Sequence, residues 1–348
     1  MPTIQAHVRR LTEEIRSVLW WNHLVSPLVG ILYTLWWFGV DHLQLPVQTI
    51  LLFTCSLFGT ASFGYWLNDL TDQTLDQRAG KSNATLGYSM SVNLSITVFL
   101  LLAGALPWYY LVQYTVGFYA WLGVLITLTL YSVPPFRLKE RGLAGVLCDA
   151  GYGHLFPVWI VLGIFASPEI TTSPDWTVLA FLGSLLLLIK GLRNICLHQL
   201  EDRHRDRRAG VRTFVLRWGP KRTANMISWL FLPLEGILLL ILATAVHPVF
   251  LAGLLFFLFT YALRVWSWKF YRSFSQRMVY RLWYVLNDFY EGTFPLLALG
   301  LLVLQKPWLG WLFPLHLFLF PRALIHWRWV WDTWKKLTFW VELRKYIL

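Results

Sequence analysis

The sequence predicts an all-α integral membrane protein, a polytopic bundle of about nine transmembrane helices followed by an interfacial helix at the C-terminus. Three observations support this prediction. Apolar segments of about 20 residues recur along the whole chain, and each is long enough to cross a bilayer. Only 14% of the 348 residues are charged, whereas about a quarter are charged in a typical soluble domain. Basic residues also occupy every second connection between the apolar segments.

The apolar segments are expected to form the transmembrane helices in chain order. They cover residues 17–40, 47–67, 94–112, 114–132, 144–166, 177–198, 224–246, 248–264 and 284–304. The polar and basic residues before the first segment do not have the pattern of a cleavable signal peptide. A shorter apolar stretch at 308–323 has marginal length for a span, so it either recrosses the membrane or dips into it. The basic, Trp-rich tail predicts an amphipathic helix on the cytosolic surface. We therefore expect a transmembrane domain over residues 1–305 and a separate C-terminal region over 306–348.

The alternation of Lys and Arg predicts the orientation. Arg9, Arg10 and Arg16 precede the first segment, and basic residues recur in the connections at 69–93, 133–143, 199–223 and 265–283. The intervening connections carry no Lys or Arg. By the positive-inside rule, the N-terminus and the four basic connections are expected in the cytosol. Contact with anionic membrane lipid accounts for the formal net charge of +12, so no nucleic-acid partner is expected.

Two of the basic connections contain copies of one motif. The first copy runs from Asn68 to Gly80 and the second from His198 to Gly210, at an offset of 130 residues. Asp72 matches Asp202, Asp76 matches Asp206, and an Arg-Ala-Gly ending recurs. The glycines of this ending, Gly80 and Gly210, are placed to end the helices or to let the backbone turn. Internal repeats in membrane proteins usually form the binding site between the two copies.

The spacing of the acids predicts a metal site. Asp69, Asp72 and Asp76 are spaced i, i+3 and i+7, which places them on one face of a helix. Crowded carboxylates repel each other unless a cation lies among them, and Mg²⁺ binds carboxylate oxygens together with phosphates and water. Two such faces opposite each other would hold a diphosphate through shared Mg²⁺ ions. The expected metal ligands are Asp69, Asp72, Asp76, Asp202 and Asp206. Solvated acids at the membrane surface are the alternative interpretation, which the repeated spacing disfavours.

Nearby cations are candidate ligands of the phosphates. Arg137 and Lys139 follow the helix-breaking pair Pro134-Pro135, although anchoring by a positive-inside loop explains the same charges equally well. Lys190 and Arg193 lie within an apolar segment, where cations usually face a polar cavity; snorkelling toward the interface is the alternative. The candidate catalytic residues are Asp72, Asp202, Lys190 and Arg193. The candidate substrate-binding residues are Asn68, Tyr131, Arg137, Lys139, Asn194, His198 and Gln199.

At these residues the chain resembles the UbiA-type superfamily of intramembrane prenyltransferases. The resemblance rests on Asn68-Asp69-x-x-Asp72-x-x-x-Asp76, on Tyr131-Ser132-x-Pro134-Pro135-x-Arg137-x-Lys139, and on Asp202-x-x-x-Asp206-x-x-Ala209-Gly210-x-x-Thr213. It implies a nine-helix bundle around a central cavity that is capped on the cytosolic side. It also implies Mg²⁺ as cofactor, a polyprenyl diphosphate as donor, and a lipophilic, often aromatic acceptor.

The resemblance also implies roles for individual residues. Asn68 and the five acids named above would bind the Mg²⁺–diphosphate, while Arg137 and Lys139 would contact the diphosphate. Gln199 stands where the second motif of the family commonly opens with Asp. We therefore expect the second copy to bind metal less tightly than the first.

Four functions compete on this sequence. Polar residues within the apolar segments favour transfer of a prenyl group to an acceptor, with Glu201, Asp149 and His154 as unranked candidates for the general base. A terpene cyclase of the same type would ionise the same donor without an acceptor. Transfer of another diphosphate-activated group, such as phosphoribosyl, is a further alternative. A transporter is disfavoured because both motif copies lie on one membrane face and not at the midplane.

Overall fold

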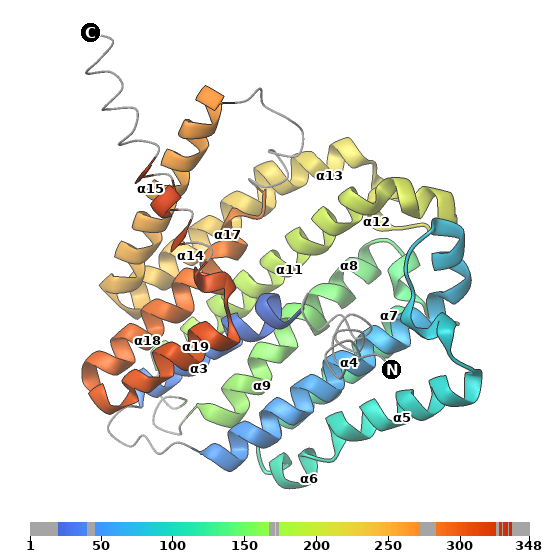
Figure 1. The fold of residues 1–348 in the computed structure, drawn as a ribbon, viewed down its shortest axis with the longest axis horizontal. Coiled ribbons are helices and arrows are strands. Elements are labelled where there is room, and N and C mark those ends of the chain that lie inside the picture. The colour runs from blue at the N-terminus through green and yellow to red at the C-terminus, as the bar shows by residue number, and fades with distance from the viewer. Residues whose placement is uncertain are drawn as a thin grey trace, which may run out of the picture. The chain divides into compact units, whose positions relative to one another are not determined.

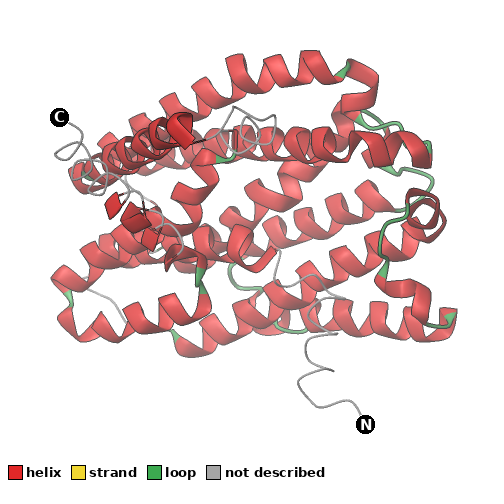
Figure 2. Cartoon of the chain, turned by 45° about the horizontal axis from the view of Figure 1, so that its top comes forward, coloured by secondary structure: helices red, strands yellow, loops and turns green. Residues whose placement is uncertain are grey.

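The computed structural model describes residues 20–39, 46–166, 171, 174–271 and 283–324, together with 327, 328, 330–332, 334 and 335. Within these residues every regular element is a helix and none is a strand (Figure 2). The predicted interfacial tail beyond residue 335, the N-terminal arginines and Arg272, Arg277 and Arg281 lie outside the described residues.

The chain divides into two compact units, each of which is described by itself. The first unit contains residues 1–21 and 42–235, and the second contains residues 22–41 and 236–348. The predicted boundary between residues 305 and 306 stays a prediction.

The first unit contains most of the helices (Figure 1). In chain order they are α4 (Val47–Ala79), η3 (Ala84–Gly87), α5 (Met90–Ala105), α6 (Trp108–Leu111), α7 (Thr115–Ser132), η4 (Leu138–Glu140), α8 (Leu143–Ala150), the π-helical η5 (Gly151–Leu155), α9 (Phe156–Phe165), α11 (Pro174–Ala209), α12 (Phe214–Trp218), α13 (Pro220–Met226), η6 (Ile227–Phe231) and the start of α14 (Leu232–Val246).

The second unit contains the remaining helices. They are most of η1 (Trp21–Val25), α3 (Ser26–Phe38), the rest of α14, α15 (Pro248–Tyr271), α17 (Val285–Asp288), η7 (Phe289–Thr293), α18 (Phe294–Gln305), η8 (Pro307–Trp311) and α19 (Leu312–Leu319). Helix α3 packs along α18, and the buried carboxylate of Glu291 forms ion pairs with His23 and with Arg322, the latter at 3.2 Å.

The predicted class, an all-α membrane bundle, is confirmed. Seven helices in the described part of the chain are long and apolar enough to cross a membrane. They are Val47–Ala79, Met90–Leu111, Thr115–Ser132, Leu143–Phe165, Asp175–Ala209, Pro220–Val246 and Pro248–Val265. The predicted first and ninth segments are also helical, but they are not among these seven. The count of nine therefore stays a prediction.

Helices α4 and α11 are longer than a membrane requires. They contain 33 and 36 residues, or about 50 Å of helix each, whereas the hydrocarbon core is about 30 Å thick. The apolar part of each helix lies at its N-terminal end, so the excess length is at the C-terminal end. That end carries the acidic motif in both helices, and the acids are therefore at or beyond the edge of the hydrocarbon.

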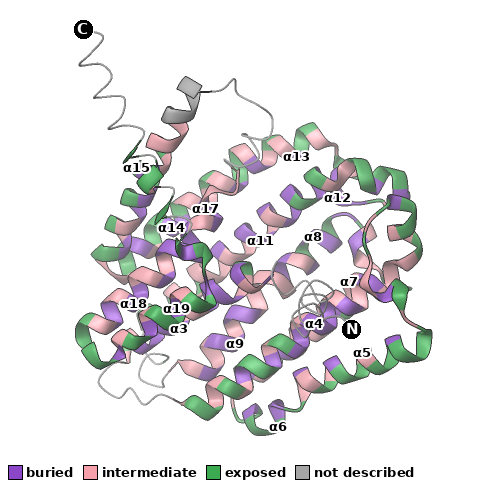
Figure 3. Cartoon of the chain, viewed as in Figure 1, coloured by how far each residue is buried: buried purple, intermediate pink, exposed green. Residues whose placement is uncertain are grey.

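Small residues allow the helices of the first unit to approach closely. A Cβ atom on Gly59 would lie 2.4 Å from the backbone nitrogen of Gly104, where α4 packs along α5. A Cβ atom on Gly163 would lie 2.3 Å from the backbone nitrogen of Gly117, where α9 packs along α7. Backbone contact at small residues is the usual way for helices to associate in lipid. The outward face of α5 is exposed and apolar, as a lipid-facing surface requires (Figure 3).

Candidate active site

The two acidic helix ends have the same backbone geometry. In the first copy, the N–H of Lys81 donates to the carbonyl of Asp76 at 2.9 Å. In the second copy, the N–H of Val211 donates to the carbonyl of Asp206 at 3.0 Å. The residue before each donor is a glycine in the left-handed region, with φ of 64° at Gly80 and 76° at Gly210. This is a Schellman-type ending, which glycine favours because it has no Cβ. The predicted role of the two glycines in ending their helices is confirmed.

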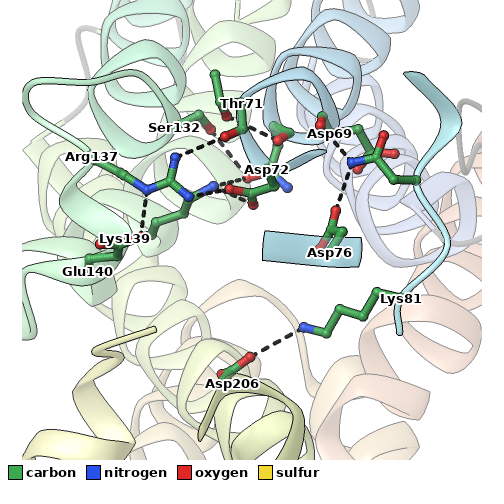
Figure 4. Close-up of polar contacts among 12 residues, drawn as sticks. Asp69, Thr71, Asp72, Asp76, Lys81, Ser132, Arg137, Lys139, Glu140 and Asp206 are labelled. Atoms are coloured by element: carbon green, nitrogen blue, oxygen red, sulfur yellow. Dashed lines mark hydrogen bonds and ion pairs between the residues drawn. The ribbon is translucent and has the colours of Figure 1, made fainter. Parts of the chain in front are cut away.

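Two cations hold the carboxylate of Asp72 (Figure 4). The Arg137 guanidinium donates to one oxygen of Asp72, and the Lys139 ammonium donates to the other at 2.5 Å. Lys139 also donates to Oδ1 of Asn68 at 2.8 Å. Arg137 has φ 38° and is the one non-glycine residue with positive φ in the described part of the chain. Such strained backbone is tolerated where the surrounding contacts fix it, and here it directs a cation at the acid.

One lysine joins the two motif copies. The Lys81 ammonium, which follows the first copy, donates to Asp202 at 3.0 Å and to Asp206 at 3.3 Å; Figure 4 shows the contact with Asp206. Arg205 adds a longer ion pair to Asp202 at 3.5 Å, and its side chain is 61% exposed. The acids of the second copy are therefore bound mainly by a cation that belongs to the first.

The environment shifts the pKa values of the two lysines in opposite directions. Burial lowers the pKa of Lys139, and the attraction of Asp72 only partly offsets it. Burial also acts to lower the pKa of Lys81, but its hydrogen bonds and charge interactions with Asp202 and Asp206 outweigh burial and raise it. Lys81 therefore keeps its proton to a higher pH than Lys139 does.

Four acids of the two copies and these cations line one pocket of about 680 Å³. It is open on one side and is formed mainly by the C-terminal parts of α4 and α11 and by the loop before α8. The residues that line it include Asn68, Asp72, Asp76, Lys81, Tyr131, Arg137, Lys139, His198, Gln199, Asp202, Arg205 and Asp206. Carboxylates bind divalent cations and the basic side chains bind phosphate oxygens, so the pocket has ligands for a metal–phosphate complex.

Comparison with known proteins identifies the family. The model of the UbiA prenyltransferase family matches residues 24–287. The chain belongs to the UbiA prenyltransferase family. A comparison with the curated proteins finds no match.

Solved structures of a UbiA homologue from Archaeoglobus fulgidus have a similar fold. The form bound to GPP and Mg²⁺ is 17% identical, with a TM-score of 0.54, and the match covers 84% of this chain and 99% of that one. The form bound to DMAPP and Mg²⁺ is also 17% identical, with a TM-score of 0.55, covering 84% and 98%. The form bound to Cd²⁺ has a TM-score of 0.52 at 17% identity, covering 83% and 99%.

The donor set of this UbiA pocket suits Mg²⁺ in combination with a phosphate. Carboxylate oxygens are its main metal-binding groups, and Mg²⁺ prefers oxygen ligands. Among the described residues, no three His, Cys, Asp or Glu side chains come close enough to hold a metal ion by themselves. Mg²⁺ is usually bound by one or two carboxylates, with substrate phosphates and water completing the octahedron. The residues therefore fit a metal that arrives with a diphosphate.

Asp69 is the predicted metal ligand that does not line the pocket. Its side chain is 2% exposed, and one carboxylate oxygen accepts the N–H of Ala84 at 3.1 Å. The amide of Asn83 donates both to the carbonyl of Asp69 at 2.6 Å and to the carboxylate of Asp76 at 2.8 Å. Asp69 thus holds the loop that returns from the first copy. Spacing on a helix could not reveal this, because the loop covers that part of the helical face.

The two predicted membrane cations, Lys190 and Arg193, are not among the residues that line the pocket. Arg193 is fully buried and donates to Glu235 of α14 at 2.5 and 2.9 Å. Lys190 is 3% exposed. Asn194, a predicted substrate ligand, lies 3.4 Å from Nε2 of His154. Arg193 has a carboxylate partner, which is Glu235 and not an acid of the motifs.

The other predicted ligands border the pocket, and several contacts there were not predicted. Gln199 lines the wall while its side-chain oxygen accepts the N–H of Val215 at 3.2 Å. The hydroxyl of Ser132 donates to Asn68 at 3.4 Å. Sequence reasoning used Lys81 only as an orientation signal. Lys81 directly follows the motif glycine, at the position where the second copy has Val211. This difference between the copies is the signal that could have pointed to Lys81.

Proposed function

We propose that this chain is an Mg²⁺-dependent intramembrane prenyltransferase that moves a prenyl group from a polyprenyl diphosphate to a lipophilic, aromatic acceptor and releases diphosphate. The observation that carries the proposal is the pocket in which both acidic motifs meet Arg137, Lys139 and Lys81. Membership of the UbiA family supports it. So do the related archaeal structures, which are bound to GPP or DMAPP together with Mg²⁺.

The residues of the pocket divide into two groups by chemistry. Asp72, Asp76, Asp202 and Asp206 would hold Mg²⁺, which supplies positive charge against the leaving diphosphate. Arg137, Lys139 and Lys81 would bind the phosphate oxygens directly, as charge-assisted donors. Each of these cations is bound to a carboxylate in the structure. A diphosphate would therefore exchange one anionic partner for another, and the cations stay oriented between catalytic cycles.

The chain would also have to keep water away from the reacting carbon. An allylic cation reacts with any nucleophile that reaches it, so a transferase needs a dry cavity beside the diphosphate. The walls next to the acids include Tyr131, Ile195 and Ala79. Tyr131 supplies an aromatic face, which attracts positive charge.

Sidedness forms part of the proposal. The distribution of basic residues supports a cytosolic N-terminus and a cytosolic position for both motifs. Single cysteines at positions 82 and 204 should react with an impermeant reagent only after the membrane is opened. Labelling of both positions in intact cells would contradict this orientation and leave the chemistry of the pocket unaffected.

The deciding experiment is product analysis with the purified full-length protein. It would be given Mg²⁺, prenyl diphosphates of graded chain length and a panel of lipophilic aromatic acceptors. The expected result is a prenylated acceptor with one diphosphate released per product. A cyclic terpene formed without acceptor, and unaffected by adding one, would instead identify a cyclase that uses the same pocket. Absence of diphosphate release with every donor would contradict the proposal.

A further inference from the structure

A polar layer lies beneath the pocket, on the membrane side of the acids. It consists of Tyr131, Asp149, Tyr152 and His198, which come from α7, α8, η5 and α11. The Tyr152 hydroxyl donates to the Asp149 carboxylate at 2.5 Å. The rings of Tyr131 and Tyr152 pack edge to face with centroids 5.4 Å apart, and their hydroxyls interact. His198, on α11, borders the same layer from the pocket side.

The layer reaches the pocket through two of its members. Tyr131 and His198 both line the pocket, and Tyr131 packs against Tyr152, the hydrogen-bond partner of Asp149. His198 precedes Asp202 by four residues on α11, which is one turn or about 6 Å deeper along the helix. His198 therefore lies on the side of the pocket where the hydrocarbon part of a bound prenyl diphosphate must begin.

Asp149 differs in its partners from four other acids of the first unit. Asp72, Asp202, Asp206 and Glu235 each form an ion pair with Lys or Arg. Within the described part of the chain, no Lys or Arg forms an ion pair with Asp149. Its hydrogen-bond partner is a neutral tyrosine hydroxyl. Asp149 is half-buried, and a carboxylate among membrane helices without a cation is costly and usually serves a function.

The backbone around Asp149 is built to hold it in place. A Cβ atom on Gly191 of α11 would lie 2.8 Å from the Cα of Ala150, so α8 and α11 touch next to Asp149. The chain then enters the π-helical turn η5, which carries Tyr152. Turns of this type occur often at functional sites. The close contact and the π-turn together fix the direction of the carboxylate.

We propose that Asp149 is the residue that receives the proton of the acceptor hydroxyl when the acceptor captures the prenyl group. This role rests on the proposed transferase function. The bond between C1 of the prenyl group and the diphosphate oxygen breaks, and its electron pair leaves with the diphosphate. An electron pair of the acceptor oxygen, or of an aromatic carbon conjugated with it, forms the new bond to C1. The hydroxyl proton passes to the Asp149 carboxylate, which becomes a neutral acid.

The other two candidate bases have less suitable surroundings. Glu201 is exposed, and it does not line the pocket. His154 lies 3.4 Å from Asn194, and it is also absent from the pocket wall. Asp149 does not line the pocket either, but its hydrogen-bond partner Tyr152 packs against Tyr131, which does.

The test measures binding of a hydroxyl compound and of its methyl ether to the full-length protein in lipid nanodiscs. The probes are 4-pentylphenol and 4-pentylanisole, each added with geranyl diphosphate and Mg²⁺, and binding is followed by the shift in unfolding temperature. Wild type should prefer the phenol by about tenfold or more, because a hydrogen bond to a charged acceptor is lost in the ether. Asp149→Asn should remove this preference, Asp149→Glu should restore part of it, and the matched control Glu201→Gln should keep it.

Each result decides the proposal. Equal binding of phenol and ether by wild type overturns it, as does an Asp149→Asn variant that is less stable but keeps the full preference. If Asp149→Asn does not fold, Tyr152→Phe replaces it in the test. This variant lacks the hydroxyl that orients Asp149, so its preference for the phenol should be severalfold weaker. An unchanged preference in Tyr152→Phe overturns the proposal. Geranyl diphosphate with Mg²⁺ should stabilise wild type and Asp149→Asn alike. If it stabilises neither, the failure lies in the proposed function itself.

Discussion

The two copies of the acidic motif share a backbone and differ in how their charges are balanced. Both end in a left-handed glycine with the same pattern of hydrogen bonds. In the first copy, Asp72 alone is held by two cations from the loop that follows α7. In the second copy, Asp202 and Asp206 share the single ammonium of Lys81, apart from one exposed arginine.

This difference indicates a division of labour between the copies. In the first copy, two cations meet at the one carboxylate of Asp72, which suits binding of the diphosphate. In the second copy, two carboxylates meet at the one ammonium of Lys81, which suits binding of the metal. The sequence favoured the first copy as the tighter metal site because Gln199 replaces an acid in the second. The structure weakens that argument, since Asp69, the residue that matches Gln199, holds a loop.

The largest expected effect is loss of a carboxylate from either copy. Asp72→Asn and Asp202→Asn should each lower diphosphate release by about 100-fold or more, because each removes charge that acts on the leaving group. Steady-state kinetics at saturating Mg²⁺ would measure it. The exposed neighbour Glu201, changed to Gln, is the control. Turnover within severalfold of wild type in either Asp variant would break the comparison, because that copy would then be dispensable.

Lys81 should have the next largest effect, because it bridges the copies. Lys81→Met keeps the length of the side chain and removes its charge, so donor affinity should fall by about tenfold. Arg205→Met is the control, and its exposed contact should matter less than about threefold. The affinity for geranyl diphosphate in the presence of Mg²⁺ measures both. Equal effects of the two variants would show that the joining role of Lys81 is unimportant.

The opposite pKa shifts of the two lysines predict a dependence on pH. Burial lowers the pKa of Lys139. The pKa of Lys81 is raised, because the effect of the acids of the second copy is larger than the opposing effect of burial. As the pH rises, Lys139 should lose its charge before Lys81 does. Donor affinity should therefore fall severalfold, and this fall should occur at a lower pH than the one at which an ordinary lysine titrates. Lys139→Arg should remove this decrease, because arginine stays protonated.

Donor affinity measured between pH 7 and pH 10 would test this prediction. Lys81→Arg is the matched control and should leave the decrease unchanged. If donor affinity still falls with rising pH in Lys139→Arg, the titrating group is not Lys139. That result would contradict the proposed difference between the two lysines.

The smallest expected effect concerns the shared backbone. Gly80→Ala and Gly210→Ala should each destabilise the fold by about 1 kcal/mol, because alanine is strained in the left-handed conformation. No atom lies within 4 Å of either added Cβ, so the loss is conformational alone. Thermal unfolding in detergent would measure it, with Gly183→Ala, in the N-terminal third of α11, as the control. Clearly unequal losses would show that the two endings are not equivalent.

Local features of the fold and site could be predicted from the sequence. The apolar segments predicted membrane helices, the positions of Gly80 and Gly210 predicted where α4 and α11 end, and the spacing of the acids predicted a shared face. These features depend on the periodicity of one helix and on residues close in sequence.

Contacts between distant segments could not be predicted in the same way. Lys81 reaches acids that lie more than 100 residues further along the chain, and Arg193 binds Glu235 of a later helix. Nothing in the spacing of α11 distinguishes a cation that faces a pocket from one that faces a neighbouring helix. For the same reason Lys190 and Arg193 were predicted together with the phosphate ligands, although neither is among the residues that line the pocket.

The buried pair between Arg193 and Glu235 has a consequence for how the protein enters the membrane. An arginine at the centre of a single helix opposes insertion by about 2.5–3.5 kcal/mol, and α11 is made before α14. If α11 moved into lipid alone, Arg193 would meet hydrocarbon without its carboxylate. Insertion of the two helices as a hairpin avoids this, because the charges neutralise each other before either faces lipid. The ion pair thus makes the biogenesis of α11 depend on the synthesis of a helix that follows it.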